Sequence, residues 1–437
     1  MFIIKIEPHN RGKELLKLHL SSNTGLETIL TINPYSCFNQ YIQSDPNPIS
    51  LDVLYFTSII YAIDKLIPRI EANDNWSRDI TVSIPVNNKK LWESSIVPLK
   101  LALDFLTGDN WILVFEDIKE PYYINRQKGL FPNDFFSTIC LFSGGLDSLS
   151  GVIDIVDEED NILLISHIDG SGASKQIQEP LIKKIKSAYS SKNIQQSVFH
   201  VYTNKNNEPT TRGRSILFHG LAIFHAINLG VKEIIASENG VISINLPLTP
   251  SRTCSNSTKT MHPYFLKKFQ EALTLLEIDV NIKNPYLLKT KGEMLIENKN
   301  PFLIRELATK SLSCSHGGGH TKGWNRKSYN CGYCIPCTIR RASIHKLDAL
   351  LDKDEDYGHG LNALEINLRK NRKRLDLLAL SYFLKRNLNL KELKREINLM
   401  AKLDNTNDIA LMLERGYIEI KEYIEAKGDS SIKRLFL

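Results

Sequence analysis

Apolar and polar positions in residues 135–348 form short apolar runs, each followed by a longer stretch with helical spacing. The predicted strands are Ser137–Phe142, Asn161–Ile168, Ser197–Tyr202 and Lys232–Ala236. The predicted helices after them are Ser148–Val156, Gln176–Ser187, Arg214–Asn228 and Tyr264–Leu276. Such alternation is typical of an α/β protein with a doubly wound parallel sheet and helices on both faces. Ligands of these sheets bind beyond the carboxyl ends of the strands, so the residues there are the first candidates for a site.

The two flanking regions have different patterns. Residues 1–134 mix strand-like runs with helical spacing; the strand-like runs are Met1–Asn10, Glu27–Ile32, Asp79–Pro85 and Trp111–Phe115, and the helical stretches are Leu51–Ile67 and Asn88–Leu106. Residues 349–437 are helical in pattern, with amphipathic spacing at Asn362–Leu384 and Leu390–Leu403. The basic run Arg369–Arg374 is typical of a solvated helix face, with phosphate or partner binding as the alternative. We predict three domains: a small amino-terminal α/β domain (1–134), a central domain (135–348) and a carboxy-terminal helical domain (349–437).

Composition narrows the class of protein only slightly. The chain has 437 residues, of which 42% are hydrophobic and 24% charged, as in ordinary globular proteins rather than disordered or fibrous ones. The net charge of +6 suits an anionic ligand and gives no reason to expect a nucleic-acid partner. No apolar run is long enough to span a bilayer, so we expect a cytoplasmic protein without membrane contacts.

A glycine-rich turn stands directly after the first strand of the central region. It reads Ser143-Gly144-Gly145-Leu146-Asp147-Ser148 and runs into a predicted helix. Two glycines let the backbone turn sharply and approach a ligand. The N–H groups at the start of the helix and the serine hydroxyls predict a cradle for a phosphate or pyrophosphate. The turn lacks both the Gly-Lys-Ser/Thr of a Walker A loop and the GxGxxG of dinucleotide sites. The alternative is a simple strand-to-helix turn in which Asp147 only caps the helix.

Four of the seven cysteines gather near residue 330. Cys314 is followed after sixteen residues by Cys331, Cys334 and Cys337 in a CxxCxxC pattern. A closed tetrahedral zinc site with four thiolate ligands fits this spacing, and because it leaves no open position the zinc would be structural. Three alternatives stay open: an iron–sulfur cluster, replacement of one cysteine by His316 or His320, and unligated thiols.

The glycine-rich turn resembles the PP-loop motif SGGxDS of the ATP pyrophosphatases, adenylating enzymes that include NAD and GMP synthetases and tRNA thiolation enzymes. The order of later motifs is similar to that of 7-cyano-7-deazaguanine synthase (QueC): Lys289–Glu293, Ser313-Cys314, CGxCxxC and a basic helix. The resemblance covers about residues 135–348. It implies the PP-loop (adenine nucleotide alpha hydrolase-like) fold, with ATP and Mg²⁺ bound. It also implies cleavage of ATP between the α and β phosphates, so that a substrate carboxylate becomes attached to AMP.

The resemblance also implies roles for individual residues. The ATP-binding loop would consist of Ser143, Gly144, Gly145, Asp147 and Ser148. Asp147 would orient this loop or help to hold Mg²⁺. Lys291 would contact the ATP phosphates and Arg214 would lie near the nucleotide; for both, a solvent-facing cation at a helix start is the alternative. The zinc ligands would be Cys314, Cys331, Cys334 and Cys337.

Several stretches depart from the QueC pattern. They follow the second and fourth predicted strands, where the substrate pocket of QueC would be: Asp169–Gly172, Glu238–Gly240, Leu246–Leu248 and Thr260–Pro263. Glu238, at the carboxyl end of a strand, is a candidate for positioning a metal or a nucleophile. His262 is a candidate base near the acceptor, with a structural turn residue as the alternative. The nucleotide motifs are intact, whereas the acceptor side differs.

QueC lacks both flanking regions, whereas long QueC-like proteins from bacterial anti-phage defence gene clusters (the QatC-like and CBASS-associated groups) have them. Asp79–Trp92 and Phe105–Trp111 are similar to the amino-terminal domain of that group. This resemblance implies an ATP-dependent carbon–nitrogen ligase that acts on a carboxylated 7-deazaguanine. The product would be an amide, a nitrile or a conjugate with an amine of a partner protein from a defence operon. The alternatives are a PP-loop tRNA thiolation enzyme and a catalytically silent nucleotide-binding subunit of a defence complex.

Overall fold

The computed structural model describes residues 1–11, 16–33, 41–42, 45–118, 135–168, 173–210, 212–249, 259–316, 324–366 and 374–437. Over these ranges the protein is an α/β structure whose ten strands form one sheet, in the order β10-β9-β6-β7-β8-β3-β2-β1-β4-β5. The strands are β1 (Phe2–Arg11), β2 (Leu16–Ser22), β3 (Glu27–Asn33), β4 (Asp79–Val86), β5 (Asn110–Asp117), β6 (Thr138–Leu141), β7 (Asn161–Ile168), β8 (Asn193–Thr203), β9 (Glu233–Ile235) and β10 (Asn281–Lys283).

Most neighbouring strands in this sheet are parallel. The five central strands, from β10 to β8, are parallel throughout, as the sequence predicts. At the other end, β4 runs parallel to both β1 and β5. The strands in between, β8-β3-β2-β1, pair antiparallel. The parallel arrangement therefore applies to the central strands, and the sheet as a whole is mixed.

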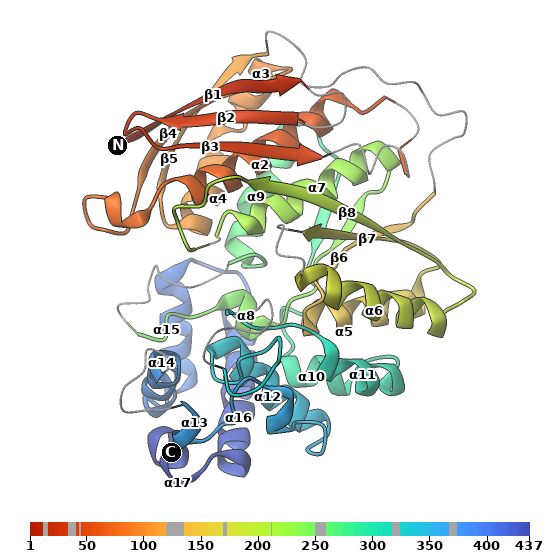
Figure 1. Cartoon of the computed structure of the whole chain (residues 1–437), viewed down its shortest axis with the longest axis vertical. Helices are drawn as coiled ribbons and strands as arrows, with labels where there is room; N and C mark the ends of the chain where they lie inside the picture. Colours follow the sequence, from red (N-terminus) through yellow and green to blue (C-terminus); the bar gives the residue numbers. More distant parts are fainter. Residues whose placement is uncertain are drawn as a thin grey trace.

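Helices pack on both faces of the central strands (Figure 1). Successive residues of a strand point to opposite faces. Accordingly, Ile139 and Leu163 belong to a core that contains residues of α2, α4, α7 and α9, whereas Cys140 and Leu164 belong to another that contains residues of α5, α6 and α11. The longer helices are α2 (Pro48–Leu66), α4 (Ile96–Thr107), α5 (Leu146–Glu158), α6 (Ala173–Ala188), α7 (Arg214–Leu229), α9 (Pro263–Leu275), α12 (Ile335–Leu347), α14 (Arg374–Lys385), α15 (Leu390–Met400) and α16 (Thr406–Lys427). The shorter ones are α3 (Lys89–Ser94), α8 (Gly240–Ile244), α10 (Lys291–Ile296), α11 (Pro301–Leu307), α13 (Ala363–Ile366) and α17 (Ser430–Phe436).

The amino-terminal strands extend the central sheet. β3 pairs with β8, with Leu30 opposite Thr203. Helices α2 and α7 pack against each other on one face of this sheet. Gly220 of α7 permits their close approach, because a Cβ at this position would lie 1.9 Å from Oγ1 of Thr57 in α2. The sequence patterns did not predict this continuity, because strand pairing across 170 residues leaves no local signal. The division into three domains stays a prediction.

The carboxy-terminal helices share a core with the cysteine segment. Cys334, Cys337 and Ile339 lie in one apolar cluster with Leu377 of α14 and Leu413 of α16. In Figure 1 these helices occupy the end of the molecule opposite to β1 and β2. The cysteine segment therefore packs directly against the carboxy-terminal helices.

The predicted elements agree with the structure except in a few places. The single helix expected at Asn88–Leu106 is two helices, α3 and α4, which meet at Ser95. The strand β2 was not predicted, although Leu16, Leu18 and Leu20 alternate in it. Asp169–Gly172 and most of Arg369–Arg374 lie outside the described residues. Among the helices that are described, none is long and apolar enough to cross a membrane.

Candidate active site and metal centre

The turn between β6 and α5 has the compact form that its two glycines predict. Gly144 has a φ of +79°, which glycine adopts without strain, and a Cβ there would lie 3.1 Å from Cγ of Gln178. The Gly145 N–H donates to Oγ of Ser143 (3.2 Å), and the hydroxyls of Ser143 and Ser148 share a hydrogen bond of 3.2 Å. The helix begins at Leu146, so the N–H groups of its first turn have no carbonyl partner within the helix. The turn therefore combines hydroxyls with a helix start, as an anion site requires.

Residues next to Cys314 brace this turn. The Leu312 N–H donates to the Gly144 carbonyl (2.9 Å), and the Leu146 N–H donates to Oγ of Ser313 (3.2 Å). Ser313 is fixed in turn by Asn330, whose Oδ1 accepts its N–H at 3.0 Å. The segment that carries the first cysteine therefore also sets the position of the glycine-rich turn.

Asp147 lies at the centre of a small polar cluster. Its Oδ1 is 3.0 Å from Nζ of Lys291, whose side chain is only 5% exposed. Its Oδ2 accepts a hydrogen bond from Nδ2 of Asn239 at 2.8 Å. Lys291 begins α10, which is capped by a reciprocal pair between Thr290 and Glu293. The structure thus brings together two predicted site residues, Asp147 and Lys291, that are 144 positions apart in the chain.

Glu238 lies beside this cluster, after β9. Oγ of Ser243 donates to its Oε2 (3.2 Å), and Nδ2 of Asn284 donates to its backbone carbonyl (2.7 Å). Burial, and secondly the Asp147 carboxylate, raise the pKa of Glu238 to about 8, against the partial compensation of Ser243 and Lys291. Some of its surface remains accessible. At neutral pH Glu238 therefore keeps its proton in this site.

The raised pKa of Glu238 predicts a pH-dependent stability. In the folded protein this carboxyl keeps its proton up to about pH 8, whereas its ordinary pKa is 4.5. Between these values the folded state binds more protons than the unfolded state, so the free energy of unfolding falls as pH rises. Relative to wild type, Glu238→Gln should gain up to ~1.4 kcal/mol of stability per pH unit in this window. Urea unfolding of both proteins over a pH series measures this; a difference that does not change with pH would contradict it.

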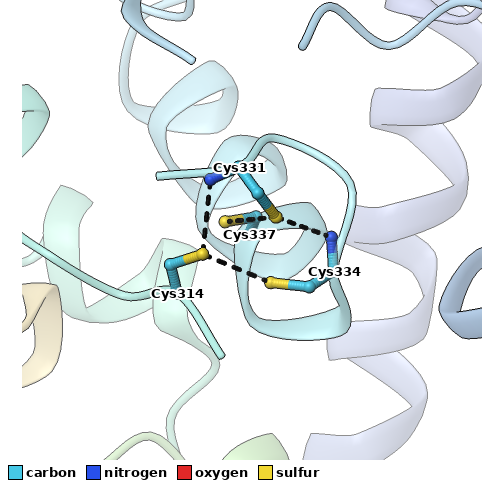
Figure 2. A group of neighbouring side chains, drawn as sticks. All are labelled: Cys314, Cys331, Cys334 and Cys337. Atoms are coloured by element: carbon cyan, nitrogen blue, oxygen red, sulfur yellow. Dashed lines mark hydrogen bonds between the residues drawn. The ribbon is translucent and has the colours of Figure 1, made fainter. Parts of the chain in front are cut away.

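The four clustered cysteines meet in space (Figure 2). Their sulfur atoms all lie within 4.8 Å of one another, with Cys314 to Cys334 at 3.9 Å and Cys331 to Cys337 at 3.7 Å. Zinc–sulfur bonds of ≈ 2.3 Å in a tetrahedron place neighbouring sulfurs about 3.8 Å apart. Backbone N–H groups of Cys331 and Cys334 each point to a sulfur at 3.3 Å. The four residues could therefore hold a metal ion such as zinc.

The chemistry of the thiols also fits a cation. Burial raises the pKa of Cys337 and of Cys331 far above the ordinary value, so a bound cation is needed to stabilise four thiolates together. His316 lies next to the sulfurs, and hydrogen bonds with Cys314 and Cys334 raise its pKa to about 10. Among the described residues, the group of ligand atoms within 4.8 Å of one another consists of the four cysteine sulfurs, without His316. His320, the other predicted alternative, lies outside the described residues.

Comparison with models of known protein families and with curated proteins finds no match for this chain. The two features that carry chemistry are the cluster at the glycine-rich turn and the four cysteines, and Leu312 to Cys314 connect them.

Arg214 and His262, the two remaining predicted site residues, have no recorded contact with the Asp147 cluster or the four cysteines among the described residues. Arg214 begins α7, with its guanidinium 5.4 Å from the ring centroid of Phe218, and its approach to a nucleotide stays a prediction. His262 is buried and caps α9, accepting the Tyr264 N–H on Nδ1 at 3.2 Å. Burial lowers the pKa of His262 to about 3, so it is neutral at physiological pH. These contacts fit the alternative given for His262 in the sequence analysis, a structural turn residue, better than the role of a base.

Sequence reasoning missed Glu419, which lies in α16 and is buried against the start of α10. Its carboxylate accepts hydrogen bonds from the Thr290 hydroxyl, from the Gly292 N–H (3.3 Å) and from Nζ of Lys346 (2.8 Å). These contacts fix the two neighbours of Lys291 in the chain. Glu419 is therefore a positioning residue for Lys291, supplied by a helix more than 120 residues away. A glutamate in an amphipathic helix carries no local signal of such a role.

The contacts of Glu419 predict a large effect of its removal. Glu419→Ala should lower the free energy of unfolding by ~2–3 kcal/mol, because the Gly292 N–H and the Thr290 hydroxyl would lose their partner in the interior. Glu425→Ala, on the exposed face of the same helix, is the matched control and should change it by less than ~0.5 kcal/mol. Equal effects of the two substitutions in chemical denaturation would contradict the role of Glu419.

Proposed function

We propose that the protein is an ATP-dependent adenylating ligase of the QueC type. The observation that carries the proposal is the cluster at the end of β6, where the glycine-rich turn, Asp147 and the buried Lys291 meet. Hydroxyls, helix N–H groups and a buried cation are the groups that stabilise a leaving pyrophosphate. ATP would bind with its phosphates on the turn, and Lys291 would neutralise part of their charge.

Magnesium is the metal that such a reaction requires. The carboxylates of Asp147 and Glu238 lie close enough to repel each other, and carboxylate oxygens are the ligand type that Mg²⁺ prefers. A dication would favour the ionised form of Glu238, which otherwise holds its proton at neutral pH. When bound, Mg²⁺ would spread the phosphate charge. The four cysteines would hold zinc in a structural role, because the site has four ligands and no open position.

The proposed reaction has two steps. A carboxylate oxygen of a 7-deazaguanine acid attacks the α-phosphorus of ATP, forming an acyl-adenylate and releasing pyrophosphate. An amine nitrogen then attacks the acyl carbon, forming an amide bond and releasing AMP and a proton. Ammonia would give the amide. A second ATP could then adenylate the amide oxygen, with release of pyrophosphate, and loss of AMP and a proton would give the nitrile, whereas a protein amine in place of ammonia would give a conjugate. The departures from the QueC pattern at Glu238–Gly240 and Thr260–Pro263 support a different acceptor, and the flanking regions support a role in anti-phage defence.

The buried cysteines argue against tRNA thiolation. Three of the four clustered thiols are buried and their sulfurs lie at metal-site distances, so they are not available as sulfur carriers. The net charge of +6 also offers little attraction for RNA.

The test is to incubate the purified protein with ATP, Mg²⁺, a carboxylated 7-deazaguanine and ammonia, and to follow pyrophosphate and product mass. The account predicts AMP, pyrophosphate and an amide or nitrile that depend on Ser143 and Asp147. Mass spectrometry of neighbouring gene products co-expressed with the protein tests for a deazaguanine-sized adduct. ATP binding without pyrophosphate in the presence of every acceptor would instead favour a silent nucleotide-binding subunit.

A further inference from the structure

The two partners of Asp147 come from segments that lie side by side. Asn239 is buried and stands directly before α8, and Lys291 begins α10. A hydrogen bond of 2.9 Å from the Gly240 N–H to the Lys289 carbonyl joins the two segments. The position of each partner therefore depends on what packs against the starts of α8 and α10.

One face of α16 packs against both of these helix starts. Met412, Gly416 and Glu419 lie on this face, because residues four and seven positions apart share one side of a helix. Gly416 is the closest point of the contact: a Cβ there would lie 2.3 Å from Cγ2 of Val241 in α8 and 3.7 Å from Cγ2 of Thr290, the residue before α10. The lack of a side chain at position 416 therefore lets α16 lie against both segments at once.

Two further residues of this face hold the same segments. A Cβ on Gly240, at the start of α8, would lie 2.4 Å from Cε of Met412 and 2.1 Å from the Leu287 carbonyl oxygen. The backbone of α8 therefore fits beside Met412 only without a side chain at its first residue. Glu419 accepts the Gly292 N–H of α10 at 3.3 Å.

Arg415 adds a polar link between α16 and α10. Its Nε and Nη2 donate to the Glu293 carboxylate at 2.6 and 3.2 Å, and Nη2 also donates to the Leu288 carbonyl at 3.0 Å. The same carboxylate accepts the Thr290 N–H at the start of α10. The contacts of α16 thus converge on the two segments that hold Asp147.

We propose that α16 positions the active site from the carboxy-terminal region, and that Gly416 is the positioning residue that sets how closely this helix approaches. The proposal rests on the proposed function, because the pair of Asp147 and Lys291 is the part of the ATP site that it concerns. A side chain at position 416 would push α16 away from α8 and α10 and would displace the partners of Asp147. Val241 cannot readily turn aside, because a β-branched side chain is stiff at χ1.

The first experiment measures exchange of labelled pyrophosphate into ATP, with Mg²⁺ and a carboxylated 7-deazaguanine, by folded full-length proteins. Gly416→Ala should lower the exchange rate about tenfold or more, because the added Cβ meets Val241 and small misplacements of reacting groups cost rate. Addition of Val241→Ala to Gly416→Ala should make room for the Cβ and restore the rate to within about threefold of Val241→Ala alone. Ala426→Val, which adds methyl groups on an exposed position of α16, is the matched control and should stay within about twofold of wild type.

A second readout does not depend on the reaction. Acetic anhydride modifies accessible lysines, and the side chain of Lys291 is only 5% exposed. Peptide mass spectrometry should find Lys291 modified about threefold faster or more in Gly416→Ala than in wild type, relative to the exposed Lys232 of the same protein. The variant that also carries Val241→Ala should return to the wild-type rate of modification.

Arg415→Gln keeps the test decisive if Gly416→Ala does not fold, because Arg415 lies at the surface. It removes the two bonds to Glu293, so it should raise the modification of Lys291 about twofold or more and lower the exchange rate. Arg386→Gln, which breaks a surface pair with Glu396 elsewhere in the carboxy-terminal region, is its control and should change neither readout.

Two results would overturn the positioning role. One is a rate of Lys291 modification that folded Gly416→Ala, or Arg415→Gln in its place, leaves at the wild-type value. The other is a loss of exchange in Gly416→Ala that Val241→Ala does not restore. No exchange by wild type would overturn the proposed function instead, and the modification of Lys291 would then decide the role of α16 by itself.

Discussion

Asp147→Asn is expected to lower the rate of pyrophosphate release from ATP by about 10²–10³-fold. The amide keeps the size of the carboxylate and can still accept a hydrogen bond from Asn239. It loses the charge that pairs with Lys291 at 3.0 Å, and it removes one of the two carboxylates offered to Mg²⁺. Because Lys291 is buried, the substitution also removes the partner that holds its ammonium group in place.

The matched control for this prediction is Asp157→Asn. Asp157 belongs to the same helix, α5, but lies on its exposed surface. Its substitution should leave the rate within twofold of wild type, as expected for a surface position without a role in the reaction. Single-turnover measurements of pyrophosphate, with metal content and folding checked for each protein, make the comparison. If Asp147→Asn releases pyrophosphate as fast as Asp157→Asn, the assignment of the turn is wrong.

Cys337→Ser is expected to abolish metal binding and to destabilise the protein by several kcal/mol. Cys337 is buried, and its sulfur lies 3.7 Å from that of Cys331. It belongs to the apolar cluster that the cysteine segment shares with the carboxy-terminal helices. A serine hydroxyl is a poor zinc ligand, and the remaining thiols would then be buried without a cation. The loss of metal should also disturb the glycine-rich turn, because Leu312 and Ser313, which precede Cys314, hydrogen-bond to Gly144 and Leu146 of that turn.

Cys140→Ser is the control for the metal prediction. Cys140 is also a buried thiol, but it lies in the core beneath α5, outside the cluster. It should keep one metal ion per chain, whereas Cys337→Ser should keep none. Elemental analysis and thermal unfolding of both proteins measure this. Wild-type metal content in Cys337→Ser would exclude the four-cysteine site. Iron and acid-labile sulfide in the wild-type protein would show that the four cysteines hold an iron–sulfur cluster and not zinc.

The parts of the fold that could be predicted from the sequence are those with local signals. The run from β6 through the glycine-rich turn into α5 combines a buried strand, a left-handed glycine and a helix start within 21 residues. The spacing of Cys331, Cys334 and Cys337 is a similarly local signal, and the structure brings Cys314 to them. Roles for Asp147 and Lys291 at one site followed only from a resemblance; that the two side chains form an ion pair is a finding of the structure.

The rest depends on contacts between distant segments. Nothing in the sequence of β3 indicates that it pairs with β8, because the hydrophobic pattern of a strand does not specify which other strand it pairs with. Glu419 is one of many acidic residues in amphipathic helices, and only tertiary packing distinguishes it from Glu425.

The central claim is that this chain cleaves ATP between the α and β phosphates at the turn of residues 143–148. Isotope exchange tests it most directly: the protein is incubated with ATP, Mg²⁺, a carboxylated 7-deazaguanine and labelled pyrophosphate, without any amine. Reversible adenylation predicts label in ATP that requires the acid and is absent with Asp147→Asn. Formation of ADP and phosphate, or no exchange by a protein that binds ATP and carries its full metal content, would contradict the account.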